Sequence, residues 1–277
     1  MKQLKQNFKK TLKHLYSDDE LNIIFIMMLE NITGQNHLAT HKVELSLTDK
    51  AVFEDNIQKL LLQIPIQYVL EEADFYGLKF KVNPSVLIPR PETEELVHLI
   101  IKKHKNQAIN ILDIGTGSGC IPITLQKNLP LTTTFAIDIS EDALEVAQQN
   151  AQLNRVEVSF FKDDALNILA SNYPVFDVIV SNPPYIAISE KNEMENTVTA
   201  HEPHLALFVS DEDPLIFYDR IADFALTNLN KKGFLYFEIN QALAEETKAL
   251  LAKKGFKAQI IKDINNNDRI IEAQLLG

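Results

Sequence analysis

The sequence has one cysteine, no tryptophan and only eight glycines among 277 residues. A single cysteine, Cys120, excludes an intrachain disulfide and is typical of the reducing cytoplasm, where we expect the protein to act. No apolar run reaches the roughly 18 residues that a membrane span needs. The polar N-terminus leads into no signal-peptide core. We therefore expect no membrane association.

Positive charge is also scarce, since 27 Lys and Arg residues stand against 38 Asp and Glu, a net charge of −11. Proteins that bind nucleic acid stably usually carry a clustered basic face. The nearest candidate is a run of five lysines from Lys2 to Lys13, which lies opposite Leu4, Phe8 and Leu12 on a helix. We interpret this run as a solvated face, and docking of a partner or RNA is the alternative.

Three segments differ in pattern. Residues 1–70 carry apolar residues at helical spacing, with Ser17 and Thr48-Asp49 as candidate caps, and predict a bundle of three to five short helices. Residues 71–90 alternate loosely around Gly77 and predict a β-hairpin linker. Residues 91–277 form the main domain, and 277 residues suffice for one large and one small domain.

Residues 91–277 alternate between strand and helix patterns, which predicts an α/β fold with a doubly wound, seven-stranded, mainly parallel sheet. The predicted strands are 109–114, 133–138, 156–161, 175–181, 232–239, 257–263 and 269–275. The predicted helices are 119–128, 141–153, 213–229 and 241–254. The last two strands are joined only by Asp263–Asp268, so we expect them to form an antiparallel hairpin.

A glycine-rich turn follows the first predicted strand of this sheet. Its sequence is Gly115-Thr116-Gly117-Ser118-Gly119, and a helix pattern begins directly after it. Glycines at such a turn let backbone approach a ligand, and the helix start offers free N–H groups. Asp138 ends the next strand 19 residues later, where it is placed to accept from a ribose diol. The pattern favours a nucleoside cofactor over an ordinary tight turn.

A second motif, Asn182-Pro183-Pro184-Tyr185, follows another predicted strand. The Asn182 side chain and the Pro183 carbonyl offer two acceptors on a stretch that the prolines hold extended. Two acceptors on the two hydrogens of one planar amine leave its nitrogen lone pair directed at an electrophile. Tyr185 adds a flat face for stacking. A proline-rich turn is the alternative for this motif alone.

Together these motifs resemble the class I S-adenosylmethionine methyltransferases, which have a Rossmann-like sheet. The segment Ile88-Pro89-Arg90-Pro91-Glu92-Thr93-Glu94 resembles more specifically the HemK/PrmC family of release factor glutamine methyltransferases. The segments Gln67-Tyr68, His201-Glu202-Pro203, Ala206-Leu207 and Phe237-Glu238-Ile239 with Gln241 resemble it too. Asn240, Asp163, Glu71-Glu72 and 209–213 depart from the family's pattern where glycines are common, which affects loop shape more than chemistry.

The resemblance implies S-adenosylmethionine as cofactor and S-adenosylhomocysteine as product. On this hypothesis the turn Gly115–Gly119 packs against the methionine portion, Asp138 binds the ribose and Ile139 flanks the adenine. Asp164 bonds the adenine amine while Ala165 or Leu166 covers the ring, and Asn182 contributes to the cofactor site. Asp113 is a candidate for ordering the turn or binding the methionine amine. The alternative for Asp164 is a helix cap of 165–170.

The implied substrate is the glutamine of the Gly-Gly-Gln loop in peptide chain release factors, held by Asn182, Pro183, Pro184 and Tyr185. Residues 1–70 would recognise the substrate protein, and the enzyme would be a monomer. The main rival is a methyltransferase of an exocyclic base amine in RNA or DNA. A catalytically silent adaptor and a dinucleotide dehydrogenase are weaker rivals.

Three further expectations concern polar residues and one long segment. We expect no metal at His201, Glu202 and His204, whose spacing is loose. Arg90 and Glu92 are expected to pair structurally, and the alternative is that they face the substrate cleft. Residues 186–212 are long and polar enough to form a lid.

Overall fold

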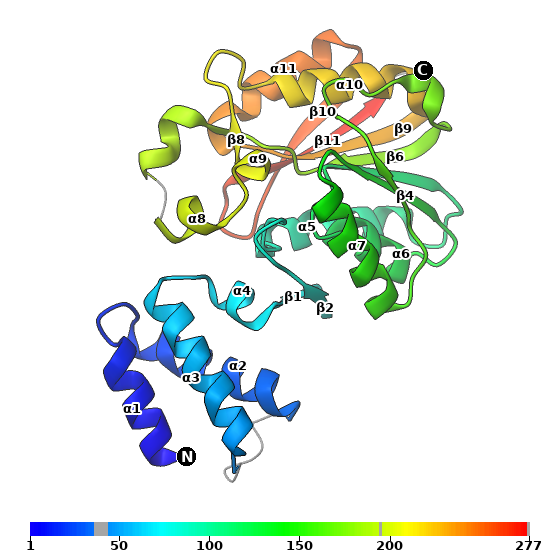
Figure 1. The fold of residues 1–277 in the computed structure, drawn as a ribbon. Coiled ribbons are helices and arrows are strands. Elements are labelled where there is room, and N and C mark those ends of the chain that lie inside the picture. Colours follow the sequence, from blue (N-terminus) through cyan, green and yellow to red (C-terminus); the bar gives the residue numbers. More distant parts are fainter. Residues whose placement is uncertain (36–43, 194–195, 276–277) are drawn as a thin grey trace. The chain divides into compact units, whose positions relative to one another are not determined.

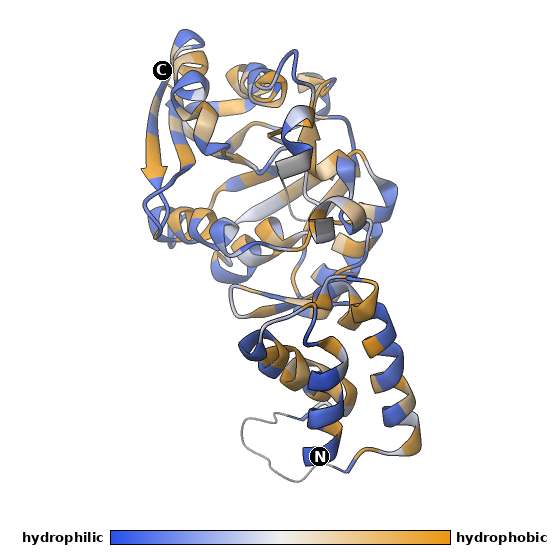
Figure 2. Ribbon diagram, turned by 90° about the vertical axis from the view of Figure 1, so that its left-hand side faces the viewer, coloured by the Kyte–Doolittle hydropathy of each residue, from blue (hydrophilic) through white to orange (hydrophobic). Residues whose placement is uncertain are grey.

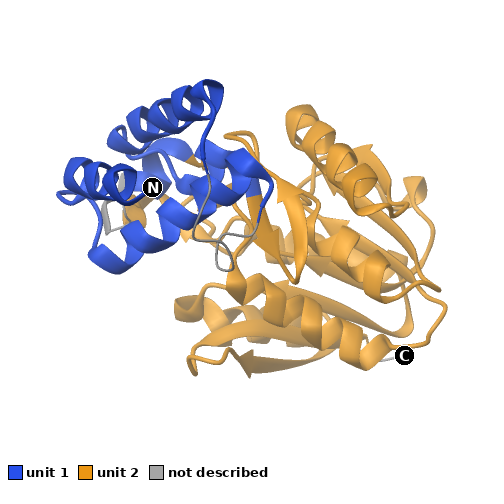
Figure 3. Cartoon of the chain, turned by 90° about the horizontal axis from the view of Figure 1, so that it is seen from below, with its two compact units in different colours: residues 1–72, 196–201 blue, residues 73–195, 202–277 orange. Residues whose placement is uncertain are grey.

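The structure, a computed structural model, describes residues 1–35, 44–193 and 196–275 (Figure 1). The chain divides into two units (Figure 3). The first comprises residues 1–72 and 196–201, and the second comprises residues 73–195 and 202–277. None of the described helices is long and apolar enough to cross a membrane.

The first unit is helical in its described part. It contains α1 (Lys2–Leu12), α2 (Asp18–Thr33), α3 (Leu47–Leu61), α4 (Ile66–Leu70) and α8 (Asn196–His201). The rings of Phe8, Phe25 and Phe53 meet at centroid distances of 5.4 to 5.8 Å and form the centre of its core. The four described helices of residues 1–70 fall within the predicted three to five.

Capping boxes fix the starts of α2 and α3. Ser17 accepts from the backbone N–H of Glu20, as the sequence predicts, and the Glu20 side chain accepts from Ser17 in return. For α3 the predicted cap at Thr48-Asp49 is wrong, because Ser46 is the cap and Asp49 is its reciprocal partner. Ser46 and Asp49 have the three-residue spacing of a capping box, whereas Thr48 has Ala51 at that distance, so the helix begins after Ser46.

The predicted hairpin is formed by β1 (Glu72–Phe75) and β2 (Leu78–Lys81). Its turn residues, Tyr76 and Gly77, have φ of 49° and 75°, as a two-residue hairpin turn requires. Phe75 and Phe80 pack edge to face at 6.0 Å and join the core of the second unit. The hairpin therefore anchors the start of the main domain.

The sheet has seven strands in the order β10-β11-β9-β6-β3-β4-β5. Their bounds are β3 (Asn110–Ile114), β4 (Thr133–Asp138), β5 (Ser159–Lys162), β6 (Phe176–Ser181), β9 (Leu229–Glu238), β10 (Phe256–Lys262) and β11 (Asp268–Leu275). The first five are parallel to one another, and β11 runs antiparallel to both β9 and β10. The predicted sheet and terminal hairpin are thus confirmed.

Helices pack on both faces of this sheet. The core on one face includes α5 (Pro91–His104), α6 (Cys120–Asn128) and part of α7 (Glu141–Asn154). The core on the other includes α10 (Ile216–Asn228) and α11 (Ala244–Lys253). Figure 2 shows hydrophobic and hydrophilic stripes on the helices, as expected where one side faces a core.

Several element boundaries differ from the sequence patterns, among them the following three. The strand predicted from 156 begins at Ser159, because the backbone N–H of Val156 bonds Ala151 at the end of α7. The strand predicted from 232 begins at Leu229, with a bulge where its register against β6 shifts. The helix predicted over 241–254 opens as a 3₁₀ turn, Gln241–Leu243, before α11.

The segment between β6 and α10 contains only short elements. They are β7 (Ile186–Ala187), a 3₁₀ helix Ile188–Glu193, α8, α9 (His204–Leu207) and β8 (Phe208–Val209). Another 3₁₀ turn, Ala170–Asn172, precedes β6. Residues 194–195 of the predicted lid lie outside the described residues, and its movement stays a prediction.

Candidate active site

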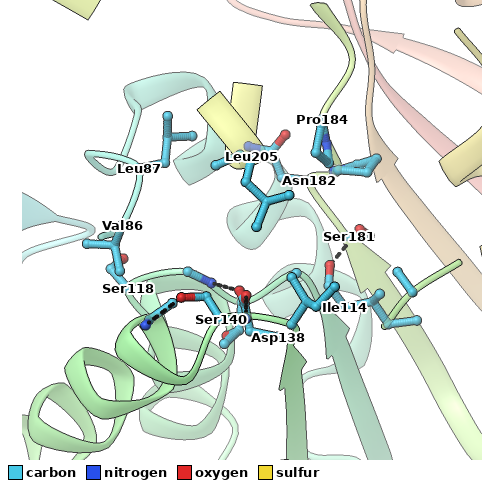
Figure 4. A pocket seen from close by; sticks show the side chains of 18 of the residues that line it. Val86, Leu87, Ile114, Ser118, Asp138, Ser140, Ser181, Asn182, Pro184 and Leu205 are labelled. Atoms are coloured by element: carbon cyan, nitrogen blue, oxygen red, sulfur yellow. Dashed lines mark hydrogen bonds between the residues drawn. The ribbon is translucent and has the colours of Figure 1, made fainter. Parts of the chain in front are cut away.

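A cavity of about 360 Å³ lies at the carboxyl ends of β3, β4, β5 and β6. The chain leaves β3 toward β4 on one side, while β6 lies on the other side, so this is the topological switch point where α/β sheets bind ligands. In Figure 4, Val86 and Leu87 lie across the cavity from Asn182 and Pro184. The sequence motifs thus meet in one place.

Eleven of the predicted site residues line this cavity. They are Gly115, Thr116, Gly117, Ser118, Asp138, Ile139, Asp164, Ala165, Asn182, Pro183 and Pro184. Gly119 and Tyr185 do not. The lining residues that site prediction missed include Ser85–Arg90, Thr93 and the group Pro203, Leu205 and Ala206.

The glycine turn is held against the neighbouring strand. The backbone N–H groups of Gly115 and Thr116 both donate to the Ile137 carbonyl, at 2.9 and 3.0 Å. Gly119, unlike Gly115 and Gly117, does not line the cavity and contributes to helix packing. Its φ is +79°, and a Cβ there would lie 3.1 Å from the Ala147 Cβ on α7, so glycine permits close packing of α6 on α7.

Asp138 links the turn to the next helix. Its carboxylate accepts from the backbone N–H of Gly117 at 2.8 Å and from that of Ser140 at 3.0 Å. Burial raises the pKa of this carboxyl. A carboxylate has about four acceptor positions, so two remain for the paired hydroxyls of a ribose.

Asp113 is fully buried, and neither carboxylate oxygen has a hydrogen-bond partner among the described residues. Burial raises the pKa of Asp113 to about 7. Asp113 does not line the cavity, whereas the two residues after it, Ile114 and Gly115, do. The acceptor positions left on Asp138 are therefore the feature of this cavity that fits a nucleoside.

We expect the unfolding free energy to report on Asp113. Its folded-state pKa lies above the ordinary value, so the stabilisation by the neutral form is complete below pH about 4 and is lost as pH rises through about 7. The Asp113→Asn variant cannot ionise at this position, so its free energy of unfolding should not show this decrease, which amounts to up to about 4 kcal/mol in the native chain. Urea unfolding of both proteins at pH 5 and pH 8 measures the difference. Parallel pH dependence would show that Asp113 ionises normally.

Asp164 lines the cavity but also binds its own turn. Its carboxylate accepts from the backbone N–H of Leu166 at 2.9 Å and from the Asn167 side chain at 2.7 Å. The alternative of a local cap is therefore present, and the proposed adenine contact has to share these oxygens. Asp163, in place of a glycine, accepts from the Tyr173 hydroxyl at 2.7 Å.

Asn182 is positioned from both sides. The Ser181 hydroxyl donates to the Ile114 carbonyl at 2.6 Å, which fixes the end of β6 against β3. The Asn182 side-chain nitrogen donates to the Thr93 hydroxyl at 3.4 Å. Further along, Asn240 donates to the Tyr185 carbonyl at 3.2 Å, so this departure from the glycine pattern stabilises the turn.

Tyr185 is placed differently from its predicted stacking position. Its ring packs against the core between the sheet and α10, and its hydroxyl donates to Glu238 at 3.2 Å. The reason is physical, since a phenol hydroxyl taken out of water needs a partner and Glu238 supplies it. Tyr185, a predicted catalytic residue, thus supports the site through Glu238 without lining the cavity.

Arg90 pairs with Glu202 rather than with Glu92, so the predicted pair is corrected. Glu202 is buried and also accepts from the backbone N–H of Ile88 at 3.2 Å. This carboxylate therefore joins the segment before α5 to the segment before α9, both of which line the cavity. Within the described residues no group of side chains is arranged to hold a metal.

Cys120 is buried, and burial raises the pKa of its thiol to about 12. The sulfur therefore stays protonated near neutral pH and is no nucleophile.

Known proteins resemble this chain over most of its length. The family model "Methyltransferase small domain" matches residues 93–206. A release factor glutamine methyltransferase of Flavobacterium psychrophilum is 46% identical, covering 98% of both chains. One of Bacteroides thetaiotaomicron is 41% identical, covering 99% of both. The solved structure of a Pyrococcus furiosus methyltransferase aligns with a TM-score of 0.56 at 18% identity, covering 83% of this chain and 99% of that one, which supports the fold.

Proposed function

The chain belongs to the family of release factor glutamine methyltransferases, and we propose that it methylates the side-chain amide nitrogen of the glutamine in the Gly-Gly-Gln loop of release factors. S-adenosylmethionine, when bound, supplies a methyl group activated by its sulfonium. The observation that carries the proposal is Asn182, which lines the same cavity as the glycine turn and gives its amide nitrogen to Thr93. Its carbonyl oxygen is left for a substrate.

The cofactor is held by residues at three strand ends. The turn Gly115–Gly119 receives the methionine portion, and Asp138 accepts from the ribose hydroxyls while it orders Gly117. Ile139, which is 44% exposed, flanks the adenine. Asp164 and Ala165 bind the other side of the base. Asp113 precedes the turn but does not line the cavity, so its role would be to order the turn.

The amide substrate is a poor nucleophile because its lone pair is delocalised into its own carbonyl. Asn182 and the Pro183 carbonyl each accept one of its N–H bonds, which returns electron density to nitrogen and fixes its direction. Pro184 holds the chain extended beyond these acceptors. As nitrogen gains positive charge in the transition state, both hydrogen bonds strengthen. The proton leaves after transfer, so the chain needs no dedicated base.

Alignment is the second requirement. Productive transfer needs nitrogen, methyl and sulfur in line, with the reacting atoms about 3–3.5 Å apart. The walls formed by Val86, Leu87 and Leu205 are apolar, and a substrate seated against them would displace water from the reacting atoms. Exclusion of water strengthens the bonds to Asn182 and Pro183, because they act in a low dielectric.

A base methyltransferase remains the main rival, since the same two acceptors suit an exocyclic base amine. The chain's net charge of −11 opposes it, because such an enzyme needs attraction to phosphates. Release factors are the partner that the family relationship supports, and we propose that the helices of the first unit recognise them.

The test is transfer of label from methyl-labelled S-adenosylmethionine. We expect label in a release factor at the Gly-Gly-Gln glutamine and none in a release factor with that glutamine changed to alanine. Total RNA and DNA serve as competing substrates in parallel reactions. Label found in nucleic acid alone would overturn the proposal.

A further inference from the structure

We propose that Thr93 and Glu238 are positioning residues that set the orientation of the Asn182 amide. The inference rests on the proposed function and concerns how its acceptor is made. The structure connects the three side chains by two hydrogen bonds. Thr93 donates to Glu238 at 2.7 Å, and Asn182 donates to Thr93 at 3.4 Å.

The side-chain amide of asparagine ends in two groups of opposite hydrogen-bonding character, an oxygen that accepts and an NH2 group that donates. In one orientation it offers oxygen to a substrate, and in the other it offers N–H. An N–H turned toward the substrate nitrogen would meet the substrate's own N–H groups and repel them. The reaction therefore needs one orientation, and the side chain of asparagine does not determine it alone.

Glu238 determines which atom donates in each of these two hydrogen bonds. A carboxylate only accepts, so the Thr93 hydroxyl must donate its single proton to it. The Thr93 oxygen then has only acceptor capacity left for Asn182. The Asn182 amide must consequently present nitrogen to Thr93, and its oxygen remains on the cavity side.

The pKa of the Glu238 carboxyl is shifted upward overall by burial, and three neighbouring groups offset part of this shift. Burial raises the pKa of this carboxyl, while the Thr93 hydroxyl, the charge of Arg269 on β11 and the Tyr185 hydroxyl lower it. Glu92 opposes ionisation from α5. Tyr185 thus contributes a second donor to the same carboxylate. This explains why the last residue of the Asn-Pro-Pro-Tyr motif turns away from the cavity.

Burial makes the arrangement rigid. Thr93 is 3% exposed and Glu238 is 2% exposed, so water cannot replace either partner. Thr93 lies in the first turn of α5, and Glu238 is the last residue of β9. The orientation of the Asn182 amide is therefore determined by α5, which precedes Asn182 in the sequence, and by β9, which follows it. Neither element belongs to the motif that contacts the substrate.

The experiment compares Thr93→Val, Thr93→Ser and Glu238→Gln with the native chain, using a release factor and labelled S-adenosylmethionine. Valine removes the acceptor for the Asn182 nitrogen. Glutamine can donate to Thr93, whose proton then turns to Asn182 and reverses the amide. We expect kcat to fall about tenfold to a hundredfold in both. Thr93→Ser keeps the hydroxyl and should stay within about threefold of the native kcat.

Calorimetric binding of S-adenosylmethionine separates orientation from loss of fold, and its Kd should stay within about twofold in every variant. The matched control is Thr247→Val on α11, an equally buried threonine whose hydroxyl bonds the Leu243 carbonyl. It should destabilise to a similar extent without changing kcat.

An unchanged kcat in Thr93→Val and Glu238→Gln, in folded proteins that bind the cofactor, would overturn the inference. If Thr93→Val does not fold, the comparison of Thr93→Ser with Glu238→Gln decides it, and equal kcat in those two rejects the inference. Failure of the proposed function looks different, because the native chain itself would then leave the release factor unlabelled.

Discussion

Replacing Asn182 by alanine should lower kcat for release factor methylation by about a thousandfold. The variant loses one of two acceptors that act where charge develops, and removal of one such group costs about a hundredfold to a thousandfold in comparable sites. Loss at the upper end is expected because a single remaining acceptor, the Pro183 carbonyl, cannot hold a planar amide in one direction. Single-turnover kinetics with saturating cofactor measure the chemical step.

The cofactor Kd of this variant should stay close to the native value, since Asn182 acts mainly on the substrate. Asn154→Ala is the matched control. That residue also donates from its side-chain nitrogen to backbone carbonyls, of Lys79 and Asn150, but does not line the cavity. Its kcat should be unchanged. Native-like transfer by Asn182→Ala would remove the basis of the catalytic assignment.

Replacing Asp138 by alanine should weaken S-adenosylmethionine binding by about a hundredfold to a thousandfold. The loss combines the ribose acceptor with two bonds that hold Gly117 and Ser140, and a hydrogen bond to a charged group contributes about 1.5–3 kcal/mol. Isothermal titration calorimetry measures the Kd. Asp138→Asn keeps one acceptor oxygen and should fall between the native chain and the alanine variant.

Asp142→Ala separates hydrogen bonding from charge. Asp142 lines the same cavity and carries the same charge. If Asp138 acts through its bonds, Asp142→Ala should change the Kd by less than about fivefold. An equal loss of cofactor affinity in Asp138→Ala and Asp142→Ala would mean that the negative charge of the cavity explains the affinity. The hydrogen bonds that order the glycine turn would then not explain it.

The local parts of this molecule could be predicted from the sequence, because each depends on neighbouring residues. The helix at Ser17, the glycine turn and the hairpin around Gly77 each follow from a few consecutive positions. The sheet follows from alternation, and its strand ends deviate by more than one residue only where a bulge near Gly233 or a helix end at Val156 changes the start.

The supporting contacts of the site could not be predicted in the same way. Thr93 and Glu238 are 145 residues apart, and Arg90 and Glu202 are 112 residues apart. No periodicity connects such positions, so their polar side chains appear in the sequence as ordinary first-turn or strand-end residues. Tyr185 shows the same limit, since its position in the motif suggests stacking, whereas its hydroxyl partner lies on a distant strand.

The strand order also has a consequence for synthesis. β11, the last strand of the chain, lies between β9 and β10, so β10 has no neighbour in the sheet until residues 268–275 arrive. Until residues 268–275 have been synthesised and have left the ribosomal exit tunnel, the edge of β9 stays open to unwanted pairing. The buried surroundings of Glu238 at the end of β9, which include Arg269 of β11, are thus completed only after β11 has emerged.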